Sequence, residues 1–492
     1  MKHLKQYSSY AFGAFGHDAF YATLSTYFML FVTSQLFNTA DSAFNTRMIG
    51  YVTVMMTVIR IAEIACDPLI GGAVDNTQTR WGKFKPWLLT GATISSVMLV
   101  LIFTNFGGLA TSQPLVYLIL FGVAFVILDI FYSFKDISFW SMLPALSTDS
   151  KVRARFGTIG RFGSTLGAQG VPIIIYPLIV FFSQQFSGTQ GSTKTQAGWT
   201  GFAVVIGLLS FLGALCVALG TKEKQNLLRK NTEHVRFRDV FKVIGQNDQL
   251  MWLSLAYFLI ALSYVVTNSL TAYYFTYVLG ASDKFYLVGV ITAILGIISV
   301  VLFPSLVAIL HREKIFVGGI AMMFVGYLLF LLAGTNLTMV LFAVAIFFFP
   351  YPMIFLAALM TITDSVEYGQ WKNGTRNESV TLSVRPLIDK LAGAIAMGVV
   401  GLAAVHAGMV GNAKPSSITA GELFTFKAYM FYIPMVMLIL SALVYTFKVK
   451  LSEKRHTEIV RELERKLRAE AKADVETETE TDSQPDTAPE QA

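Results

Sequence analysis

Residues 60–87 read RIAEIACDPLIGGAVDNTQTRWGKFKPW, a stretch that begins with the charged residues Arg60, Glu63 and Asp67 among apolar ones and ends in a cluster of basic residues. A second apolar run, YVTVMMTVI at 51–59, precedes it. A charged side chain at the centre of a bilayer costs at least about 2.5–3.5 kcal/mol on insertion scales. Arg60, Glu63 and Asp67 therefore need a reason to be there, and their spacing of three and four residues places them on one stripe of a helix.

The rest of the chain is also strongly apolar. Of its 492 residues, 54% are hydrophobic and only 14% are charged, and the mean hydropathy is +0.57. Apolar stretches of about 20 residues can cross a hydrocarbon layer of about 30 Å as helices, whereas the alternating pattern of a membrane barrel is absent. We predict an all-α membrane protein with twelve transmembrane helices, at 9–33, 47–73, 86–105, 114–144, 156–186, 200–220, 250–279, 285–310, 315–335, 338–364, 385–411 and 425–447.

The formal charge of +7 is distributed as in a membrane protein. Connectors after odd-numbered spans contain few basic residues, whereas the even-numbered connectors 74–85, 145–155, 221–249 and 311–314 are rich in them. Basic connectors stay on the cytoplasmic side. We therefore expect a multi-pass protein of the cytoplasmic membrane, surrounded by lipid, with both termini in the cytoplasm and no role in binding nucleic acid.

The chain divides into two halves of six spans. We expect an N-terminal six-helix bundle at 1–220, a central cytoplasmic loop at 221–246, a C-terminal six-helix bundle at 247–450 and a charged, partly disordered tail at 451–492. DPLIGGAVDNTQTRWGKFKP ends span two, and FPSLVAILHREK ends span eight, its counterpart in the second half. Two such bundles around a central path are the architecture of a secondary transporter of the major-facilitator type.

The three charges of span two suggest a cation site. Two carboxylates one turn apart, Glu63 and Asp67, can coordinate Na⁺ or Li⁺ through oxygen atoms, or can share a proton. Pro68 follows Asp67 and frees a backbone carbonyl nearby. The alternative is structural, with Arg60 neutralising Glu63 and joining helices.

Spans one and four carry the candidates for a sugar site. His17 and Asp18 stand among glycines and aromatic residues in GAFGHDAFYATLSTYF. In span four, one helical face carries Asp129, Tyr132, Ser133, Asp136 and Trp140, with Lys135 beside it. A buried acid next to aromatic rings suits a sugar, whose hydroxyls bond to the carboxylate and whose C–H faces stack on rings. Alternatively, Asp18 pairs with a basic residue to pack helices, and Trp140 is an interfacial anchor.

Several charged residues remain. Arg161, just inside span five, can contribute to the sugar site or simply follow the distribution of cytoplasmic charges. Between spans ten and eleven, Asp364, Lys372 and Glu378 are candidates for a cytoplasmic gate. Lys390 lies deeper in span eleven and is a better candidate for the transport path, whereas Arg385 and Asp389 can pair with each other.

The sequence contains no phosphate-binding loop, no metal-ligand cluster and no nucleophile with its base. We therefore expect neither an enzyme nor a resident cofactor. Transport of a solute against its concentration gradient would therefore be driven by an ion gradient or by exchange.

Four motifs resemble those of one family, the glycoside–pentoside–hexuronide:cation symporters. They are GAFGHDAFYATLSTYF at 13–28, DPLIGGAVDNTQTRWGKFKPW at 67–87, KDISFWSMLPALS at 135–147, and DSVEYGQWK at 364–372 with RPLIDK at 385–390. The likeness extends over about residues 8–450. It is strongest to the lactose/galactoside permeases of Gram-positive bacteria, which include raffinose-type members.

The resemblance implies roles for individual positions. It makes Asp18, Asp136, Trp140 and Arg161 sugar-binding residues, and Glu63, Asp67 and Asp136 cation ligands. It also implies that Lys390 bridges the two sites and that Lys372 and Glu378 take part in coupling. To these we add neighbours from the same helix faces: His17 and Tyr132 at the sugar site, Ser133 at the cation site, and Arg60 and Asp364 among the coupling or gate residues.

This sequence departs from the family pattern at a few positions. Cys66 stands where sodium-using relatives have asparagine and Glu63 where they have aspartate, and both differences favour H⁺ over Na⁺. Thr375 stands where lactose permeases have histidine, which leaves the choice among lactose, melibiose and raffinose open. Many relatives carry a C-terminal regulatory domain, and only the short acidic tail follows here, so we expect no regulation through such a domain.

The sequence therefore predicts cation-coupled symport of galactosides, with the proton as the favoured ion. Galactoside:galactose exchange is the alternative within transport. A membrane sugar sensor is a different class, which would need no cation site and would show no net flux. An intramembrane aspartyl enzyme would need a Gly-x-Gly-Asp setting that the sequence lacks.

Overall fold

A computed structural model of the chain describes residues 2–77, 79–146, 150–189, 191, 193–223, 245–374, 378–410 and 413–466. These residues are almost entirely helical, as the sequence predicts, with one isolated bridge between Thr79 and Gly82. The first group of elements, in which η marks short 3₁₀ or π segments, is α1 Lys2–Ala22, η1 Thr23–Tyr27, α2 Phe28–Phe31, η2 Val32–Leu36, α3 Ser42–Asn76, α4 Lys85–Ile102, η3 Phe106–Gly108, α5 Leu109–Ser112, α6 Pro114–Leu146, α7 Ser150–Ser187 and α8 Gln196–Gly220. The second group is α10 Asp248–Tyr273, η5 Tyr274–Val278, η6 Ser282–Lys284, α11 Tyr286–Ala333, α12 Leu337–Phe348, α13 Tyr351–Asn373, α14 Glu378–His406, η7 Pro415–Ser417, α15 Ala420–Lys427, η8 Ala428–Tyr432 and α16 Ile433–Lys448.

The helices account for the predicted spans. Within the residues that the structure describes, ten segments are long and apolar enough to cross a membrane, and one of them, Ser282–Ala333, covers two predicted spans. It bends at His311, whose φ of 63° and ψ of 156° break the helix. The first predicted span corresponds to the continuous run from α1 to η2.

Side-chain caps explain where several helices begin. Asp41 accepts a hydrogen bond from the backbone N–H of Phe44 at the start of α3, and Asn247 accepts one from Leu250 at the start of α10. Each cap satisfies one of the four backbone donors that a helix N-terminus leaves free. Thr419 and Glu422 form a reciprocal capping box at α15.

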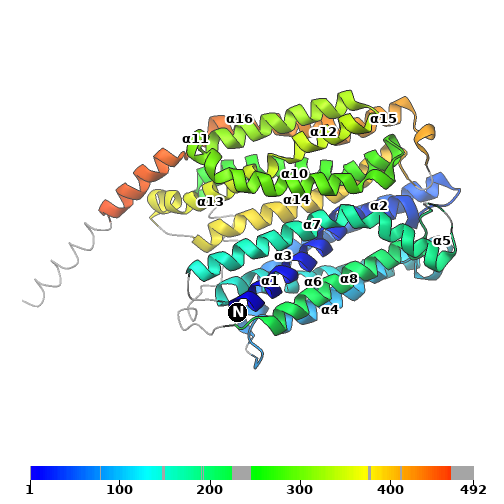
Figure 1. Cartoon of the computed structure of the whole chain (residues 1–492), viewed down its shortest axis with the longest axis horizontal. Coiled ribbons are helices and arrows are strands. Elements are labelled where there is room, and N and C mark those ends of the chain that lie inside the picture. Colours follow the sequence, from blue (N-terminus) through cyan, green and yellow to red (C-terminus); the bar gives the residue numbers. More distant parts are fainter. Residues whose placement is uncertain are drawn as a thin grey trace, which may run out of the picture.

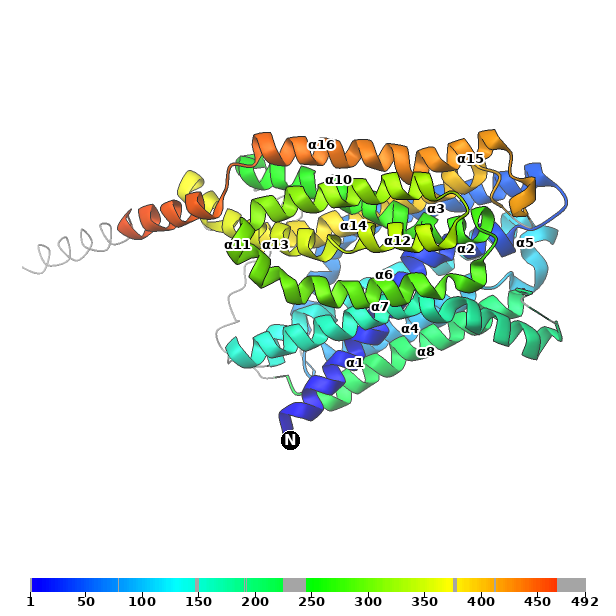
Figure 2. The ribbon, with the colours of Figure 1, turned by 45° about the horizontal axis from the view of Figure 1, so that its top comes forward.

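The helices pack as two groups (Figures 1 and 2). In the first, α1 packs on α7 and α8, and α4 packs on α6 and α8; in the second, α10 packs on α14 and α16, and α11 packs on α12 and α13. The groups meet along two pairs of helices, α3 with α14 and α7 with α11. The loop expected to join them lies mostly outside the described residues, which omit 224–244.

Small residues allow the closest helix approach. A Cβ atom at Gly163 of α7 would lie 2.1 Å from the carbonyl oxygen of Ala11 in α1, and one at Gly167 would lie 2.1 Å from that of Phe15. No side chain fits in that space, so glycine is required for the two backbones to touch. Close contacts of this kind hold membrane helices together, because lipid provides no hydrophobic drive between them.

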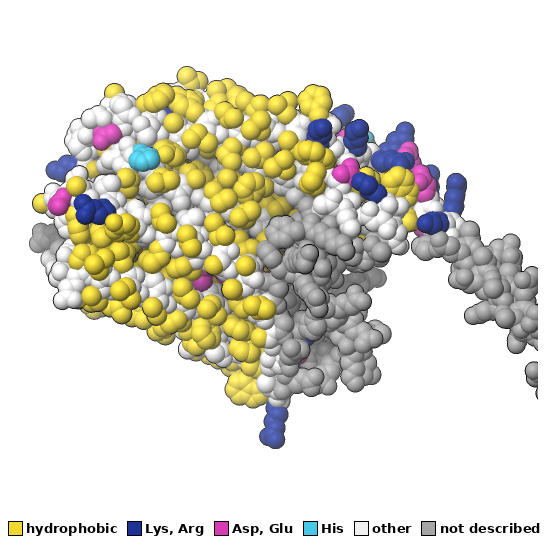
Figure 3. All heavy atoms as spheres, turned by 180° about the vertical axis from the view of Figure 1, so that it is seen from behind, with side chains coloured by type: hydrophobic (Ala, Val, Ile, Leu, Met, Phe, Trp, Pro, Cys, Tyr) yellow, Lys and Arg dark blue, Asp and Glu magenta, His cyan; other side chains and the backbone are white. Residues whose placement is uncertain are grey.

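The outer surface matches a membrane environment. Figure 3 shows one flank covered largely by hydrophobic side chains, with Lys, Arg, Asp and Glu concentrated toward the two ends of the molecule. Large apolar side chains such as Leu115, Ile309 and Leu332 are strongly exposed. Exposed apolar surface of this extent is stable only against lipid.

The two ends differ in how the groups of helices meet. We call the end that holds the N-terminus and the helix at 453–466 the near end, at the left of Figure 1, and the opposite end the far end. At the far end, hydrogen bonds join the groups between Thr33 and Tyr273 at 2.7 Å and between Tyr176 and Thr276 at 2.9 Å. Lys194 also donates to Ser282 at 3.1 Å. These hydrogen bonds join the two groups of helices at the far end.

Candidate functional site

The charged residues of α3 meet α6 and α14 in the middle of the molecule. Glu63 accepts hydrogen bonds from Ser133 Oγ at 2.5 Å and from Arg60 Nη1 at 3.2 Å. Lys390, from the other group of helices, donates to Asp67 and lies 3.5 Å from Glu63 Oε1. The structure thus brings together the predicted cation ligands Glu63, Asp67 and Ser133, and places Lys390 among them.

Asp129 of α6 completes this arrangement. Its Oδ1 lies 3.0 Å from Arg60 Nη1, the same nitrogen that donates to Glu63. Only 2% of the Asp129 side chain and 8% of the Arg60 side chain are exposed. Buried charges persist only where they are paired. We call Arg60, Glu63, Asp67, Asp129 and Lys390 the charge cluster.

A second polar group lies between α1 and α6. His17 donates from Nε2 to Asp136 Oδ1 at 2.9 Å and lies 3.3 Å from the Tyr132 hydroxyl. Asp18 is 3.9 Å from the same nitrogen. Although they lie mid-helix, the Asp18 and Asp136 side chains are 19% and 23% exposed. Their oxygens are therefore available to hydroxyl groups of a ligand.

Aromatic rings surround this polar group. The His17 imidazole stacks on Phe139 with ring centroids 5.2 Å apart, and Trp140 meets it edge-on at 6.2 Å. Tyr132 stacks between Phe20 and Tyr21. Acids flanked by ring faces match the sugar-site pattern that the sequence suggests.

One face of α6 connects the two sets of residues. Asp129 contacts Arg60, Ser133 donates to Glu63, and Asp136 accepts from His17. The intervals of four and three residues keep all three side chains on one stripe. The two sets of residues are therefore connected by side chains of a single helix.

Two basic side chains take different positions. Lys135 is buried, donates to Ser210 of α8 at 2.9 Å and lies over the Phe20 ring at 4.1 Å. Arg161, predicted at the sugar site, is exposed and lies over the ring of Phe355 in the other group at 4.8 Å. Arg161 therefore links α7 of the first group to α13 of the second.

The remaining predicted residues lie nearer the near end. Lys372 pairs with Asp248 at the start of α10. Arg385 and Asp389 form the ion pair that their spacing suggests, at 2.6 Å, and Tyr257 also donates to Asp389 at 2.9 Å. The side chain of Glu378, predicted in the gate, lies outside the described residues, as does Thr375.

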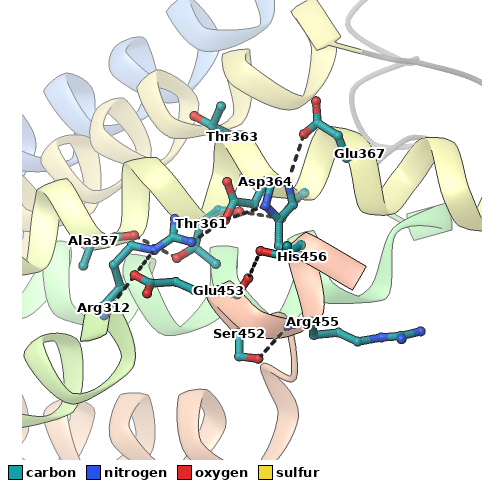
Figure 4. A network of polar contacts seen from close by, with 12 residues as sticks. Arg312, Ala357, Thr361, Thr363, Asp364, Glu367, Ser452, Glu453, Arg455 and His456 are labelled. Carbon is teal, nitrogen blue, oxygen red and sulfur yellow. Dashed lines mark hydrogen bonds and ion pairs between the residues drawn. The ribbon is translucent and has the colours of Figure 1, made fainter. Parts of the chain in front are cut away.

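Asp364 belongs to a network that anchors the helix at 453–466 (Figure 4). Arg312 donates from Nη2 to Asp364 Oδ2 at 2.5 Å and from Nε to Glu453 Oε1 at 2.8 Å. His456 lies 3.7 Å from Asp364 and 3.6 Å from Glu367. One arginine thus links α13 to the tail helix.

We expect Glu453→Gln to loosen the tail helix. Burial raises the pKa of Glu453, but its bonds with Arg312 and His311 outweigh burial and hold the pKa below its usual value. The contact is therefore fully present above the usual glutamate pKa and is lost as the pH falls through the lowered value. Limited trypsin digestion of the tail should become about fivefold faster, since a charge-assisted bond is replaced by a neutral one.

Glu458→Gln is the matched control, because among the described residues Glu458 pairs with the half-exposed Arg455 of the same helix, at 3.0 Å, and with no other element. Trypsin should digest the tail of this variant at the wild-type rate. Equal acceleration in both variants would contradict the role given to Glu453.

Sequence reasoning missed several partners. The sequence places Asp129 on the α6 face of the sugar-site candidates but does not indicate Arg60 as its partner, although its spacing of four residues from Ser133 was a signal. Arg312, Asp248 and Glu453 gave no local signal, because their partners lie on distant helices.

The fold and the two linked polar sites define a multi-pass membrane transporter. Residues 9–453 match the family described as MFS/sugar transport protein. The chain belongs to this family, as its resemblance to the glycoside–pentoside–hexuronide:cation symporters implies.

Individual relatives agree with this assignment. The lactose permease of Lactobacillus delbrueckii subsp. bulgaricus is 47% identical over 456 residues, which cover 93% of this chain and 72% of the permease. The raffinose carrier protein of Pediococcus pentosaceus is 45% identical over 92% of this chain and 70% of the carrier. The structure of a D-xylose-proton symporter has the same fold, with a TM-score of 0.65 at 15% identity, over 92% of this chain and 98% of that one.

Proposed function

We propose that this protein carries galactosides such as lactose, melibiose or raffinose across the cytoplasmic membrane by cation-coupled symport. The close relatives are named as lactose permeases and a raffinose carrier. The observation that carries the coupling is the shared face of α6, where Asp136 faces the sugar site and Ser133 bonds to Glu63 of the cation site. We take H⁺ as the favoured ion and Na⁺ as the alternative.

In this proposal the sugar binds between α1 and α6. Asp18 and Asp136 accept hydrogen bonds from its hydroxyls, while His17 and Tyr132 hold the Asp136 carboxylate in place. Trp140 offers a ring face to the C–H side of the hexose. Arg161 approaches the sugar from α7 when the two groups of helices close.

The cation binds at Glu63 and Asp67, with Ser133 and Asp136 near it. Lys390 occupies Asp67 in the structure, so an arriving cation competes with it. Because Lys390 lies on α14 and Asp67 on α3, this competition acts on a helix pair that joins the two groups. Releasing Lys390 weakens one contact between the groups and favours reorientation.

The two groups of helices act as the moving bodies, 1–220 against 247–450, joined by the 221–246 loop. Both termini and the 451–492 tail face the cytoplasm, because the basic connectors gather at that end. Hydrogen bonds join the two groups at the far end, so we assign access to the sites in this state to the cytoplasmic end. Asp364 and Lys372 lie toward this end in the structure, and we assign to them, together with Glu378, the regulation of closure there.

The test is galactoside uptake by reconstituted vesicles under an imposed pH gradient or an imposed Na⁺ gradient. We expect accumulation with the pH gradient alone, abolished by a protonophore. Accumulation with Na⁺ alone would make Na⁺ the coupling ion. Flux only when galactose is preloaded inside would establish exchange instead, and no flux with lactose, melibiose or raffinose would refute the proposal.

A further inference from the structure

Asp129 is the buried acid that the transport scheme leaves without a role. It lies 3.0 Å from Arg60 Nη1 and is 2% exposed. The charged or titratable groups that face it are Arg60 and Glu63 of α3 and Lys390 of α14, and Tyr21 of α1 and Tyr132 face the same arginine. A carboxyl group in this position affects every other charge in the cluster.

The charge cluster does not balance. Arg60 and Lys390 contribute two positive charges, and three carboxyl groups contribute three negative charges when ionised. With all three acids ionised, the cluster therefore carries one excess negative charge. Without Asp129, the two remaining acids would be neutralised by the two bases, and a cation approaching Glu63 and Asp67 would meet no net attraction.

The contacts of Arg60 lead to the same conclusion. A single nitrogen, Nη1, contacts both Asp129 and Glu63. Asp129 thus competes with Glu63 for the guanidinium. If Asp129 were neutral, Arg60 would pair with Glu63 alone. That ion pair would compete with a cation for the Glu63 carboxylate.

We propose that Asp129 is a positioning residue of the cation site, which holds Arg60 and supplies the net negative charge that lets Glu63 and Asp67 bind the coupling cation. This inference rests on the proposed symport. It makes the affinity of the transporter for its coupling cation depend on Asp129, which is not itself a ligand of that cation. A purely structural role, in which the Arg60–Asp129 pair only packs α3 on α6, predicts different behaviour of the variants below.

The test compares single and double variants in reconstituted vesicles, with the cation concentration that half-saturates galactoside uptake as the readout. Asp129→Asn should raise that concentration about tenfold or more, because the net charge of the cluster becomes zero. Asp129→Glu keeps the charge and should stay close to wild type. Arg60→Gln together with Asp129→Asn restores one excess negative charge and should bring the value back to within about threefold of wild type.

The double variant separates the two explanations. If the ion pair were only structural, removing both partners would not repair cation affinity beyond the single variant, and that result would overturn the proposal. Asp389→Asn is the matched control, since it also removes an acid paired to an arginine, Arg385, outside the charge cluster. It should shift cation affinity by less than about threefold.

The folding of the variant and the proposed symport are tested separately. Thermal unfolding in detergent shows whether Asp129→Asn is folded. If it is not, Arg60→Gln alone replaces it as the test variant. The extra negative charge of that variant should lower the half-saturating cation concentration. Wild-type protein without any gradient-driven uptake would refute symport itself. Coupled uptake by wild type together with unchanged cation dependence in Asp129→Asn would refute only the role of Asp129.

Discussion

Replacing Asp136 with asparagine is expected to weaken galactoside binding about 100-fold or more. The Asp136 carboxylate accepts from His17 at 2.9 Å and remains 23% exposed, so it still has an oxygen for sugar hydroxyls. Hydrogen bonds to a charged group contribute about 1.5–3 kcal/mol each, and two sugar hydroxyls can reach one carboxylate. Asparagine keeps the shape but loses the charge and one acceptor, so binding should fall while the helix stays intact.

Equilibrium binding of a labelled galactoside to purified protein measures this change directly. Ser138→Ala is a suitable control on the same helix, because the buried Ser138 hydroxyl has no hydrogen-bond partner in the described structure. That variant should bind within about twofold of wild type. A galactoside affinity equal to that of the wild type in Asp136→Asn would show that Asp136 does not bind the sugar.

The fold could be predicted from the sequence because membrane helices are encoded locally. Each predicted span is a run of apolar residues long enough to cross a bilayer, and each has a helix in the structure. The bend at His311 lies between the predicted spans ending at 310 and beginning at 315. The helices capped by Asp41 and Asn247 begin at Ser42 and Asp248, close to the predicted span starts at 47 and 250.

Contacts within one helix could be predicted as well. The spacing of Arg60 and Glu63 indicated a shared stripe, and the structure pairs them at 3.2 Å. Arg385 and Asp389, four residues apart, also pair. In both cases the helical repeat alone brings the two side chains together.

Contacts between helices could not be predicted in the same way. The pairs Arg60–Asp129 and Lys390–Asp67 depend on the rotation and depth of two helices relative to each other, which no local pattern specifies. Lys390 was recognised as deep in its span, but its partner lies 323 residues away. The same limit applies to Arg161, whose contact with Phe355 follows from how the two groups of helices face each other.

Replacing Glu63 with glutamine is expected to abolish uphill accumulation while leaving measurable sugar exchange. Glu63 is the residue on which the charge cluster converges, since Arg60, Ser133 and Lys390 all contact its carboxyl group. Glutamine can still bond to Ser133, but it cannot bind a proton or coordinate a cation with a charged oxygen. Exchange needs only the loaded carrier to reorient, and the sugar site on the opposite end of the α6 face remains intact.

Two measurements on the same vesicles distinguish coupling from general damage. Accumulation under an imposed ion gradient should fall to the equilibrium level, at least about tenfold below wild type, whereas counterflow of labelled galactoside should persist. Glu63→Asp keeps a carboxylate on the same face of α3 and should retain accumulation, because the negative charge that binds the cation is preserved. Full accumulation by Glu63→Gln would exclude Glu63 from the cation site and would leave Asp67 as the carboxylate of α3 that binds the coupling ion.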